Sequence, residues 1–354
     1  MSTLENTQIR LIKRPTGEIK DSDFSITTES IDSSEDSLNQ GDILVEHLMT
    51  GLDPGMRGWM DEMYDSYAPP VELGEVMSAA SCVSRVIASR NESFTTGDLV
   101  WTFGSWQNFQ VLSAELAAMC MKLPEEPRVP YSTYLSVLGY TGLTAYSGMI
   151  AVGKPQAGET ILVSGAAGAV GSIAGQLAKL KAKDCRVVGI AGSKEKCEWL
   201  TNTAGFDSSI NYKEVNDMRL AIQQHCPNGI DLFFDNIGGE ILDAALMNIN
   251  TSARILMCGT ISNYNDAVDD RAGPANMWQL LVKNARIEGF TVSHPDHVAR
   301  WQEYRDNMEQ WIVEGKLHYR DQVVKGIDNT LEAFRSLFQS GNSGRLIMQF
   351  SDEI

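Results

Sequence analysis

The stretch Ile161–Ser172, with the sequence ILVSGAAGAVGS, constrains the fold more than any other part of the chain. A run of apolar residues stops abruptly, and glycines follow at every third position, Gly165, Gly168 and Gly171. Glycines between a strand and a helix permit a tight turn, let the backbone approach a phosphate, and let the helix pack closely on the strand. The start of the helix adds unpaired N–H groups and a partial positive charge. The stretch therefore predicts a dinucleotide-binding turn, although Ala166 occupies the first slot of the usual G-x-G-x-x-G pattern.

The chain around this stretch alternates between apolar strands and amphipathic helices. The turn lies after TILVS and before AVGSIAGQLAKLKA, and further strand–helix units follow as far as ARIEGFTVS. Near-continuous apolar strands separated by helices indicate a parallel sheet that is covered on both faces. This context makes the glycine pattern specific; the alternative is a glycine-rich turn without a ligand. We predict an α/β fold with a doubly wound, six-stranded parallel sheet, a Rossmann domain, at residues 131–299.

The rest of the chain has a different character. Residues 1–130 contain short strands separated by turn residues, which indicates a β-rich domain. The tail, residues 300–354, ends in GRLIMQF, a single strand that needs a sheet to join. We therefore expect residues 300–354 to complete the N-terminal domain.

Composition limits the partners of the chain. Its 354 residues carry a net charge of −17, which leaves no basic surface for nucleic acid. No apolar run is long enough to span a membrane, and the N-terminus lacks the apolar core of a signal peptide. The six cysteines lie far apart without a C-x-x-C pair, which favours reduced thiols over disulfides or metal ligands. These features predict a cytoplasmic protein in which a local cluster of Lys or Arg holds any anionic ligand.

The end of the second strand of the Rossmann domain indicates which dinucleotide binds. Sites for NAD usually place an Asp or Glu about 20 residues past the glycines, where it binds the ribose hydroxyls. In this chain the strand RVVGIAG ends in Gly192 and is followed by Ser193 and Lys194, so a hydroxyl and an ammonium stand where a 2′-phosphate would lie. The pattern favours NADPH over NADH. The alternative for Lys194 is a solvated lysine in the first turn of a helix, where a cation opposes the helix dipole.

Several motifs together resemble the zinc-independent medium-chain dehydrogenases/reductases, in the branch of the leukotriene/prostaglandin reductases and curcumin reductases. They include LDPGMRGWM, LGYTGLTAYSGM, GAAGAVGSIAGQLAKLKA, DNIGGEILDAAL, CGTISNYN and GNSGRL, and the similarity covers nearly the whole chain. The resemblance implies a GroES-like catalytic domain made of residues 1–130 and 300–354, a Rossmann domain that binds NADPH, and a homodimer.

The resemblance also assigns roles to individual residues. The glycine turn would approach the pyrophosphate, Lys194 and Tyr212 would hold the 2′-phosphate, and residues at later strand ends would line the adenosine and the nicotinamide. The GNSG motif would reach the cofactor from the catalytic domain. The implied cofactor-binding residues are Gly168, Ala169, Val170, Gly192, Ser193, Lys194, Tyr212, Asn236, Cys258, Phe290, Val292 and Asn342.

Tyr264 in the motif ISNYN is the candidate catalytic residue. It follows the end of the fifth strand, where α/β sheets present groups to ligands. The resemblance implies reduction of the C=C bond of α,β-unsaturated ketones or aldehydes, and the enolate oxygen formed in that reaction needs a hydrogen-bond donor such as Tyr264. The alternative is a tyrosine that packs or lines the substrate site. For the whole chain, the alternatives are an NADPH quinone reductase and a non-catalytic NADPH-binding protein.

Two motifs depart from the family pattern near the expected substrate cleft. Gly55 stands where relatives usually have tyrosine, and Tyr140-Thr141 stands in place of Met-Pro, so the substrate is not inherited from the family. The sequence also lacks the cysteine and histidine spacing of zinc-dependent relatives, and His294 and His297 are too few ligands for a closed site. We therefore expect no metal.

Overall fold

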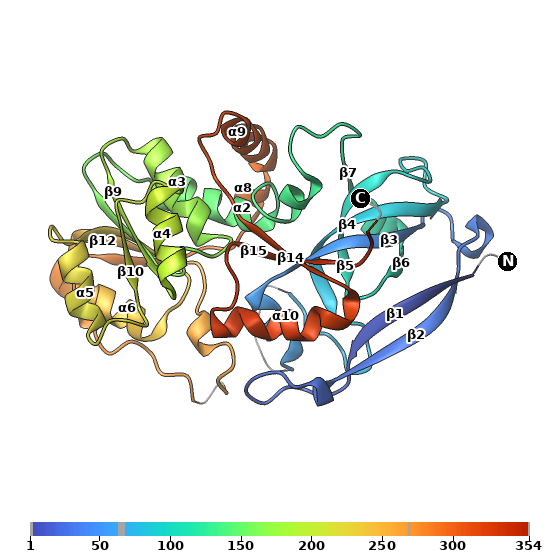
Figure 1. Cartoon of the computed structure of the whole chain (residues 1–354), viewed down its shortest axis with the longest axis horizontal. Coiled ribbons are helices and arrows are strands. Elements are labelled where there is room, and N and C mark those ends of the chain that lie inside the picture. Colours follow the sequence, from blue (N-terminus) through green and yellow to red (C-terminus); the bar gives the residue numbers. More distant parts are fainter. Residues whose placement is uncertain (1–2, 63–67, 268–269, 353–354) are drawn as a thin grey trace. The chain divides into compact units, whose positions relative to one another are not determined.

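The computed structural model describes residues 3–62, 68–267 and 270–352. Contacts between residues divide the chain into two compact units. The first comprises Met1–Gly139, Asp321–Gly341 and Arg345–Ile354, and the second comprises Tyr140–Arg320 and Asn342–Gly344. Figure 1 shows the course of the chain through the helices and strands of both units.

The second unit is built around a six-stranded parallel sheet. Its strands are β8 (Thr160–Val163), β9 (Arg186–Ala191), β10 (Ser208–Asn211), β11 (Ile230–Asp235), β12 (Ile249–Met257) and β13 (Arg286–Gly289). They follow the order β10-β9-β8-β11-β12-β13, so the sheet grows outward in one direction from β8 and then in the other from β11. This is the strand order of a doubly wound Rossmann domain, and the predicted fold class is confirmed.

Helices precede, separate and follow these strands along the chain. They are α2 (Tyr140–Tyr146), α3 (Gly171–Lys181), α4 (Lys194–Asn202), α5 (Met218–His225), α6 (Gly239–Leu246), α7 (Trp278–Lys283), α8 (Pro295–Val298) and α9 (Trp301–Val313). A π-helical segment, η5 (Ser147–Gly153), continues α2. Strand residues such as Leu162, Val188 and Phe233 are fully buried, because helices cover the sheet on both faces.

The first unit is rich in antiparallel strands. They are β1 (Thr3–Leu11), β2 (Phe24–Asp32), β3 (Ile43–Leu52), β4 (Ser78–Ser89), β5 (Leu99–Ser105), β6 (Phe109–Leu112), β7 (Met121–Lys122), β14 (Asp321–Lys325) and β15 (Arg345–Gln349), with the helices α1 (Ala114–Ala117) and α10 (Thr330–Ser336). The terminal strand β15 pairs antiparallel with β3 and parallel with β14. The expectation that the last strand joins the N-terminal sheet is therefore confirmed.

The boundaries between the units differ from the predicted ones. The first unit extends to Gly139 rather than to residue 130, because the 3₁₀ turn η4 (Tyr131–Leu135) packs against β3, β4 and β15. The segment 300–320 belongs to the second unit rather than to the first. Its helix α9 buries Tyr304, whose ring meets the ring of Tyr146 in α2 edge-on at 5.7 Å.

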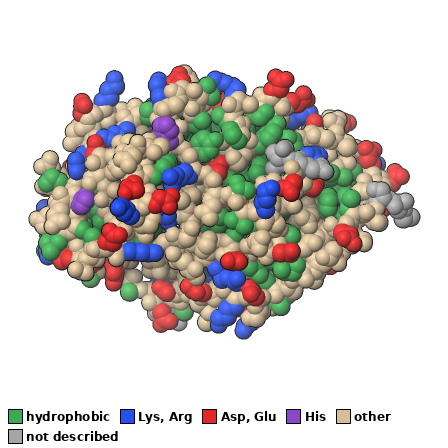
Figure 2. All heavy atoms as spheres, in the orientation of Figure 1, with side chains coloured by type: hydrophobic (Ala, Val, Ile, Leu, Met, Phe, Trp, Pro, Cys, Tyr) green, Lys and Arg blue, Asp and Glu red, His purple; other side chains and the backbone are tan. Residues whose placement is uncertain are grey.

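The surface is mixed in charge on the face that Figure 2 shows. Lys and Arg side chains are interspersed with Asp and Glu there rather than gathered in one basic area. Within the described ranges, no helix combines the length and the apolar character that crossing a bilayer requires. Any positive site for an anionic ligand on this face is therefore local.

Candidate cofactor-binding and catalytic site

The glycine turn links β8 to α3. Gly165 has a φ of +57°, a left-handed conformation that favours glycine. At Gly171, the first residue of α3, a Cβ atom would lie 2.4 Å from the carbonyl oxygen of Gly165. A Cβ atom at Gly168 would lie 3.2 Å from the same oxygen. The turn folds back on the start of the helix so closely that the backbone itself requires glycine at 165 and 171.

The segment just before α3 is suited to an anion. Gly168, Ala169 and Val170 are partly exposed, and Val170 is the residue that precedes the helix. Its apolar side chain cannot cap the first helical amides, so these amides lack the usual side-chain acceptor. A helix start with small neighbours and no cap binds phosphate groups well. These three residues lie together at this helix start, where a pyrophosphate is predicted to bind, and the turn and helix start are called the cradle below.

A short segment from the far end of the sequence lies against the glycine turn. The amide of Gly344 donates to the carbonyl oxygen of Ala167 at 2.8 Å, and Gly344 forms a parallel bridge with Gly168. The side-chain amide of Asn342 donates to the carbonyl oxygen of Gly344 at 3.3 Å. The structure thus places Asn342 beside the cradle, within the same unit.

Asp235, at the end of β11, organises the carboxyl edge of the sheet. It is fully buried, and it accepts hydrogen bonds from the hydroxyl of Ser164 at 2.6 Å and from the amides of Ile237 and Gly238. Burial raises the pKa of the Asp235 carboxyl, and these hydrogen bonds oppose that rise. Ser164 and Asp235 were not predicted from the sequence. Each stands at a strand end in an apolar run, where a polar side chain indicates a structural or binding role.

Asn236 and Cys258 are fixed by this arrangement. The amide of Asn236 donates to the hydroxyl of Ser164, and its side chain donates to the Ser164 carbonyl at 2.7 Å. The amide of Cys258 donates to the carbonyl oxygen of Asp235 at 2.9 Å. Burial, together with the charge of Asp235, raises the pKa of the Cys258 thiol to about 12, so the thiol stays protonated. Both predicted residues lie at the edge where the glycine turn begins.

The end of β9 carries the residues predicted for the 2′-phosphate. A Cβ atom at Gly192 would lie 2.8 Å from the ring of Tyr212, so the ring packs directly on the backbone there. Ser193 caps α4, and its hydroxyl accepts a hydrogen bond from the amide of Lys196. The side chain of Lys194 is 82% exposed, and its ammonium lies 3.8 Å from Glu198. The structure brings Gly192, Ser193 and Tyr212 together and leaves Lys194 in solvent.

A different lysine in the same helical turn faces this region. Lys196 is partly buried, and its pKa is lowered by burial and then by the charge of Lys213. The ammonium of Lys213 lies 5.9 Å from the ring centroid of Tyr212. Two positive charges that lie near one ring would be stabilised by an anion between them. Sequence analysis missed Lys196, which stands three residues after the helix cap.

Phe290 lies in a tightly defined position after β13. Its ring meets Phe234 at 6.0 Å and His297 at 6.2 Å, both edge-on. A Cβ atom at Gly148, in the π-helical segment, would lie 2.4 Å from the Phe290 ring. Val292, two residues further on, is partly exposed. Of the two residues predicted to flank the nicotinamide, Phe290 is thus held in place by close packing of its ring.

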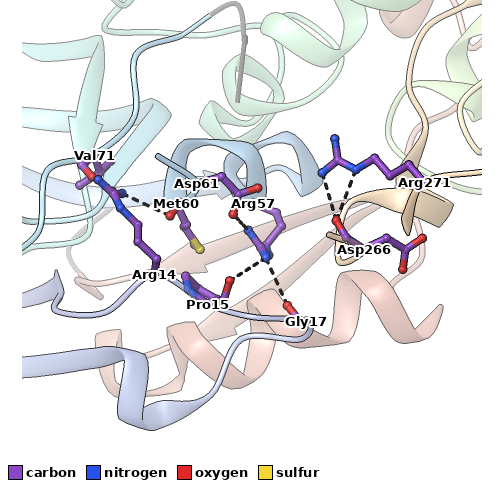
Figure 3. Close-up of polar contacts among 9 residues, drawn as sticks. All are labelled: Arg14, Pro15, Gly17, Arg57, Met60, Asp61, Val71, Asp266 and Arg271. Carbon is purple, nitrogen blue, oxygen red and sulfur yellow. Dashed lines mark hydrogen bonds and ion pairs between the residues drawn. The ribbon is translucent and has the colours of Figure 1, made fainter. Parts of the chain in front are cut away.

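Tyr264 follows a short 3₁₀ turn after β12. The amide of Thr260 donates to its hydroxyl oxygen at 3.3 Å. A Cβ atom at Gly259 would lie 3.0 Å from that hydroxyl and 3.2 Å from the carbonyl oxygen of Asn236. The hydroxyl therefore lies at the carboxyl edge of the sheet, close to the Asn236 backbone, as the sequence predicted. Two residues after Tyr264, the carbonyl oxygen of Asp266 accepts hydrogen bonds from the guanidinium of Arg271 (Figure 3).

The two family departures lie in separate packing environments. Gly55 belongs to the 3₁₀ segment that contains Arg57, a buried residue whose guanidinium donates to the carbonyls of Pro15 and Gly17 and to Asp61 (Figure 3). This network anchors the backbone next to Gly55.

Tyr140 lies in the second unit. Its ring meets the ring of Trp301 in α9 edge-on at 5.4 Å, and the guanidinium of Arg305 lies 4.7 Å from the Trp301 ring centroid. Burial raises the pKa of Tyr140. Its neighbour Thr141 is buried. The tyrosine at this departure therefore packs on α9 rather than extending freely into solvent.

Comparison with known proteins agrees with this geometry. Family models described as the N-terminal domain of oxidoreductase and as zinc-binding dehydrogenase match residues 7–120 and 169–313. An NADPH-dependent curcumin reductase of Escherichia coli (strain K12) is 36% identical over 347 residues, or 97% of this chain and 96% of that one. An NADP(+)-dependent 2-alkenal reductase of Nicotiana tabacum is 35% identical over 350 residues, or 99% of each chain. The chain belongs to the medium-chain dehydrogenase/reductase superfamily.

A solved structure narrows the position within the superfamily. CurA from Vibrio vulnificus, in complex with NADPH, superposes with a TM-score of 0.88 and 38% identity, covering 98% of this chain and 99% of that one. Together with the two reductases above, it places this medium-chain reductase in the branch that its motifs resemble. In this chain the first family model lies within the first unit and the second within the second unit, and residues 121–168 between the two models include the boundary at Gly139.

The description of the second family model raises the question of zinc in this reductase. Within residues 3–62, 68–267 and 270–352, no three or more His, Cys, Asp or Glu side chains group closely enough to hold a metal ion. His297 instead has its Nδ1 atom 2.7 Å from the carbonyl oxygen of Thr291, and His294 interacts with Asp296. The expectation that the reductase works without metal stays a prediction.

Replacing Lys196 by Ala tests which lysine binds the 2′-phosphate. We expect Lys196→Ala to weaken NADPH binding by about tenfold or more, the loss typical of a hydrogen bond to a charged group. Binding of NADH, which has no 2′-phosphate, should change little. Lys194→Ala is the matched control and should change neither affinity by more than about twofold, because an exposed charge contributes little. Fluorescence titration measures both, and a larger effect of Lys194→Ala would contradict the assignment.

Proposed function

We propose that this reductase uses NADPH to reduce the C=C bond of α,β-unsaturated ketones and aldehydes. The observation that carries the proposal is the place of the Tyr264 hydroxyl, at the same sheet edge as the glycine turn and Asn236. Parallel strands present ligand-binding groups at that edge. The curcumin reductase and the 2-alkenal reductase support the substrate class, since an alkenal has a C=C bond conjugated to its carbonyl.

NADPH fits the residues that the structure places at this edge. Gly168 has no side chain that would stand in the way of a phosphate, and the start of α3 has no side-chain cap on its amides. Lys196 and Lys213 supply positive charge beside Tyr212, and no carboxylate follows the end of β9 until Glu195. CurA is solved with NADPH, and the curcumin reductase depends on NADPH by name. The predicted cofactor is confirmed.

The chain's own residues would position the substrate and stabilise its charge. NADPH supplies the hydride when it is bound. As negative charge develops on the substrate carbonyl oxygen, the Tyr264 hydroxyl would donate a hydrogen bond to it and stabilise that charge. The Thr260 amide donates to the Tyr264 oxygen and would stabilise a phenolate there. A proton from Tyr264 or from water then completes the reduction at the α-carbon.

A panel of acceptors tests the reaction. We expect NADPH consumption with enals and enones of graded length, with a product that keeps its carbonyl group and has lost its C=C bond. NADH should be a poor substitute. Mass spectrometry identifies the product and absorbance follows the cofactor. Consumption with simple quinones alone would favour a quinone reductase, and NADPH binding without turnover of any acceptor would favour a non-catalytic protein.

The Tyr264→Phe variant tests the proposed donor. Removing one hydrogen-bond donor to a developing oxyanion typically lowers kcat by about 10²–10³-fold. We expect a loss of that order with the affinity for NADPH unchanged. Tyr131→Phe is the control, because the Tyr131 hydroxyl donates to the local carbonyl oxygens of Pro124 and Glu125. Unchanged turnover in Tyr264→Phe would remove Tyr264 from the mechanism.

We propose that the reductase forms a homodimer through β13 and α7. The strand β13 lies at one edge of the six-stranded sheet, and three of its four residues are exposed. The helix α7 exposes Trp278, Leu281 and Val282 by 57%, 85% and 56%. An open strand edge next to apolar side chains invites aggregation unless a partner covers it. A second copy supplies an identical edge, as isologous pairing requires.

Replacing Leu281 by Asp should separate such a dimer into monomers, because a carboxylate would be buried at the interface. Leu220→Asp, at a 44% exposed position on α5, should leave the assembly unchanged. Analytical ultracentrifugation measures the mass of each. A monomeric wild type, or a Leu281→Asp variant that remains dimeric, would contradict this interface.

A further inference from the structure

Arg320 connects parts of the second unit that lie far apart in the sequence. Its guanidinium carbon lies 4.9 Å from the ring centroid of Trp199 in α4. Its Nη1 atom lies 3.3 Å from Glu195 in the first turn of α4 and 3.1 Å from the hydroxyl of Ser343. A ring, a carboxylate and a hydroxyl therefore hold one cation in place, and the planar guanidinium suits all three.

The backbone that carries Arg320 is equally well fixed. The buried side chain of Gln176 in α3 donates to the carbonyl of His318 and accepts from the amide of His318, both at 2.7 Å. A Cβ atom at Gly344 would lie 2.1 Å from the carbonyl oxygen of Arg320. Gly344 has a φ of +69°, which the backbone there requires. The position of Arg320 is thus set by α3 and by the segment that lies on the glycine turn.

The carboxylate that Arg320 contacts lies where it would repel a bound phosphate. Glu195 stands in the first turn of α4, directly before Lys196, and its charge raises the pKa of Lys196 against the larger effects of burial and Lys213. Its charge therefore also reaches an anion held by Lys196. Without a cation beside it, Glu195 would repel a phosphate that lies within about 10 Å, the Debye length at 0.1 M salt. Arg320, whose Nη1 atom lies 3.3 Å from Glu195, is a cation placed to offset that repulsion.

We propose that Arg320 is a specificity-determining positioning residue, which pairs with Glu195 and thereby lets the first turn of α4 accept the 2′-phosphate of NADPH. This inference rests on the proposed function, since it concerns the same cofactor. Arg320 acts through Glu195 and has no assigned contact with the cofactor itself. Arg320 thereby contributes to the preference for NADPH over NADH, although it lies after β13, the last strand of the parallel sheet.

Two fragments of the cofactor test this inference without any reaction. We measure the affinities of the full-length protein for 2′,5′-ADP and for 5′-AMP by calorimetry, which isolates the 2′-phosphate. Arg320→Ala should weaken 2′,5′-ADP binding by roughly threefold to fivefold and change 5′-AMP binding by less than about 1.5-fold. The loss should shrink at 0.5 M salt, where charges are screened. Arg320→Lys keeps the charge and should retain most of the affinity.

The second variant is the double substitution Arg320→Ala with Glu195→Gln. Removal of the carboxylate should restore 2′,5′-ADP binding close to the wild-type value, because nothing is left to offset. Equal weakening of both fragments by Arg320→Ala would show a purely structural role and overturn the inference. So would failure of Glu195→Gln to restore binding. If the wild type itself does not prefer 2′,5′-ADP, the proposed function fails at its cofactor, which is a distinct result.

Discussion

The close approach of two pieces of backbone, at Gly165 and Gly171, determines the arrangement of the second unit. With no room for a Cβ atom at Gly171, the strand β8, the turn and the helix α3 form one rigid bend. The same lack of space recurs along α3, where a Cβ atom at Gly175 would lie 2.0 Å from the ring of Phe206. The helix therefore packs on its neighbours at close range, and its start is held at the sheet edge where ligands bind.

That edge combines two opposite electrostatic devices. At its centre the buried carboxylate of Asp235 is surrounded by donors, and these donors fix the backbone of Asn236. At its β9 end, cations are collected in a chain whose net charge is −17. A strongly negative protein repels anions at long range, so its affinity for a phosphorylated ligand depends on a few close charges and on dipoles of the backbone. The affinity for a phosphorylated ligand therefore depends on the local arrangement of charges and not on the net charge of the chain.

Much of this architecture was predictable from the sequence. Apolar strands, amphipathic helices and spaced glycines fixed the Rossmann sheet, because these patterns act locally. The direction of a side chain was harder to predict: Lys194 and Lys196 occupy one helical turn, and only the packing of α4 shows that Lys194 points into solvent while Lys196 is partly buried. The structure groups α9 with the second unit, which the sequence did not predict, because its buried Tyr304 packs on Tyr146, 158 residues earlier in the chain.

The contacts of Arg320 were beyond prediction for a related reason. It meets Glu195 across 125 residues of sequence, and no local pattern records such a pair. Ser164 and Asp235 are likewise joined across 71 residues, although each stands at a strand end. Residues that act through distant partners become visible only when the fold brings them together.

The packing of residues 342–344 against the glycine turn has a consequence for folding during translation. During translation, residues 342–344 emerge after all six parallel strands of the second unit, because they follow β13 in the sequence. A polypeptide cut short at residue 341 would retain all six strands and still lack these residues. The glycine turn therefore gains its last backbone neighbour only after the chain has grown well past the sheet.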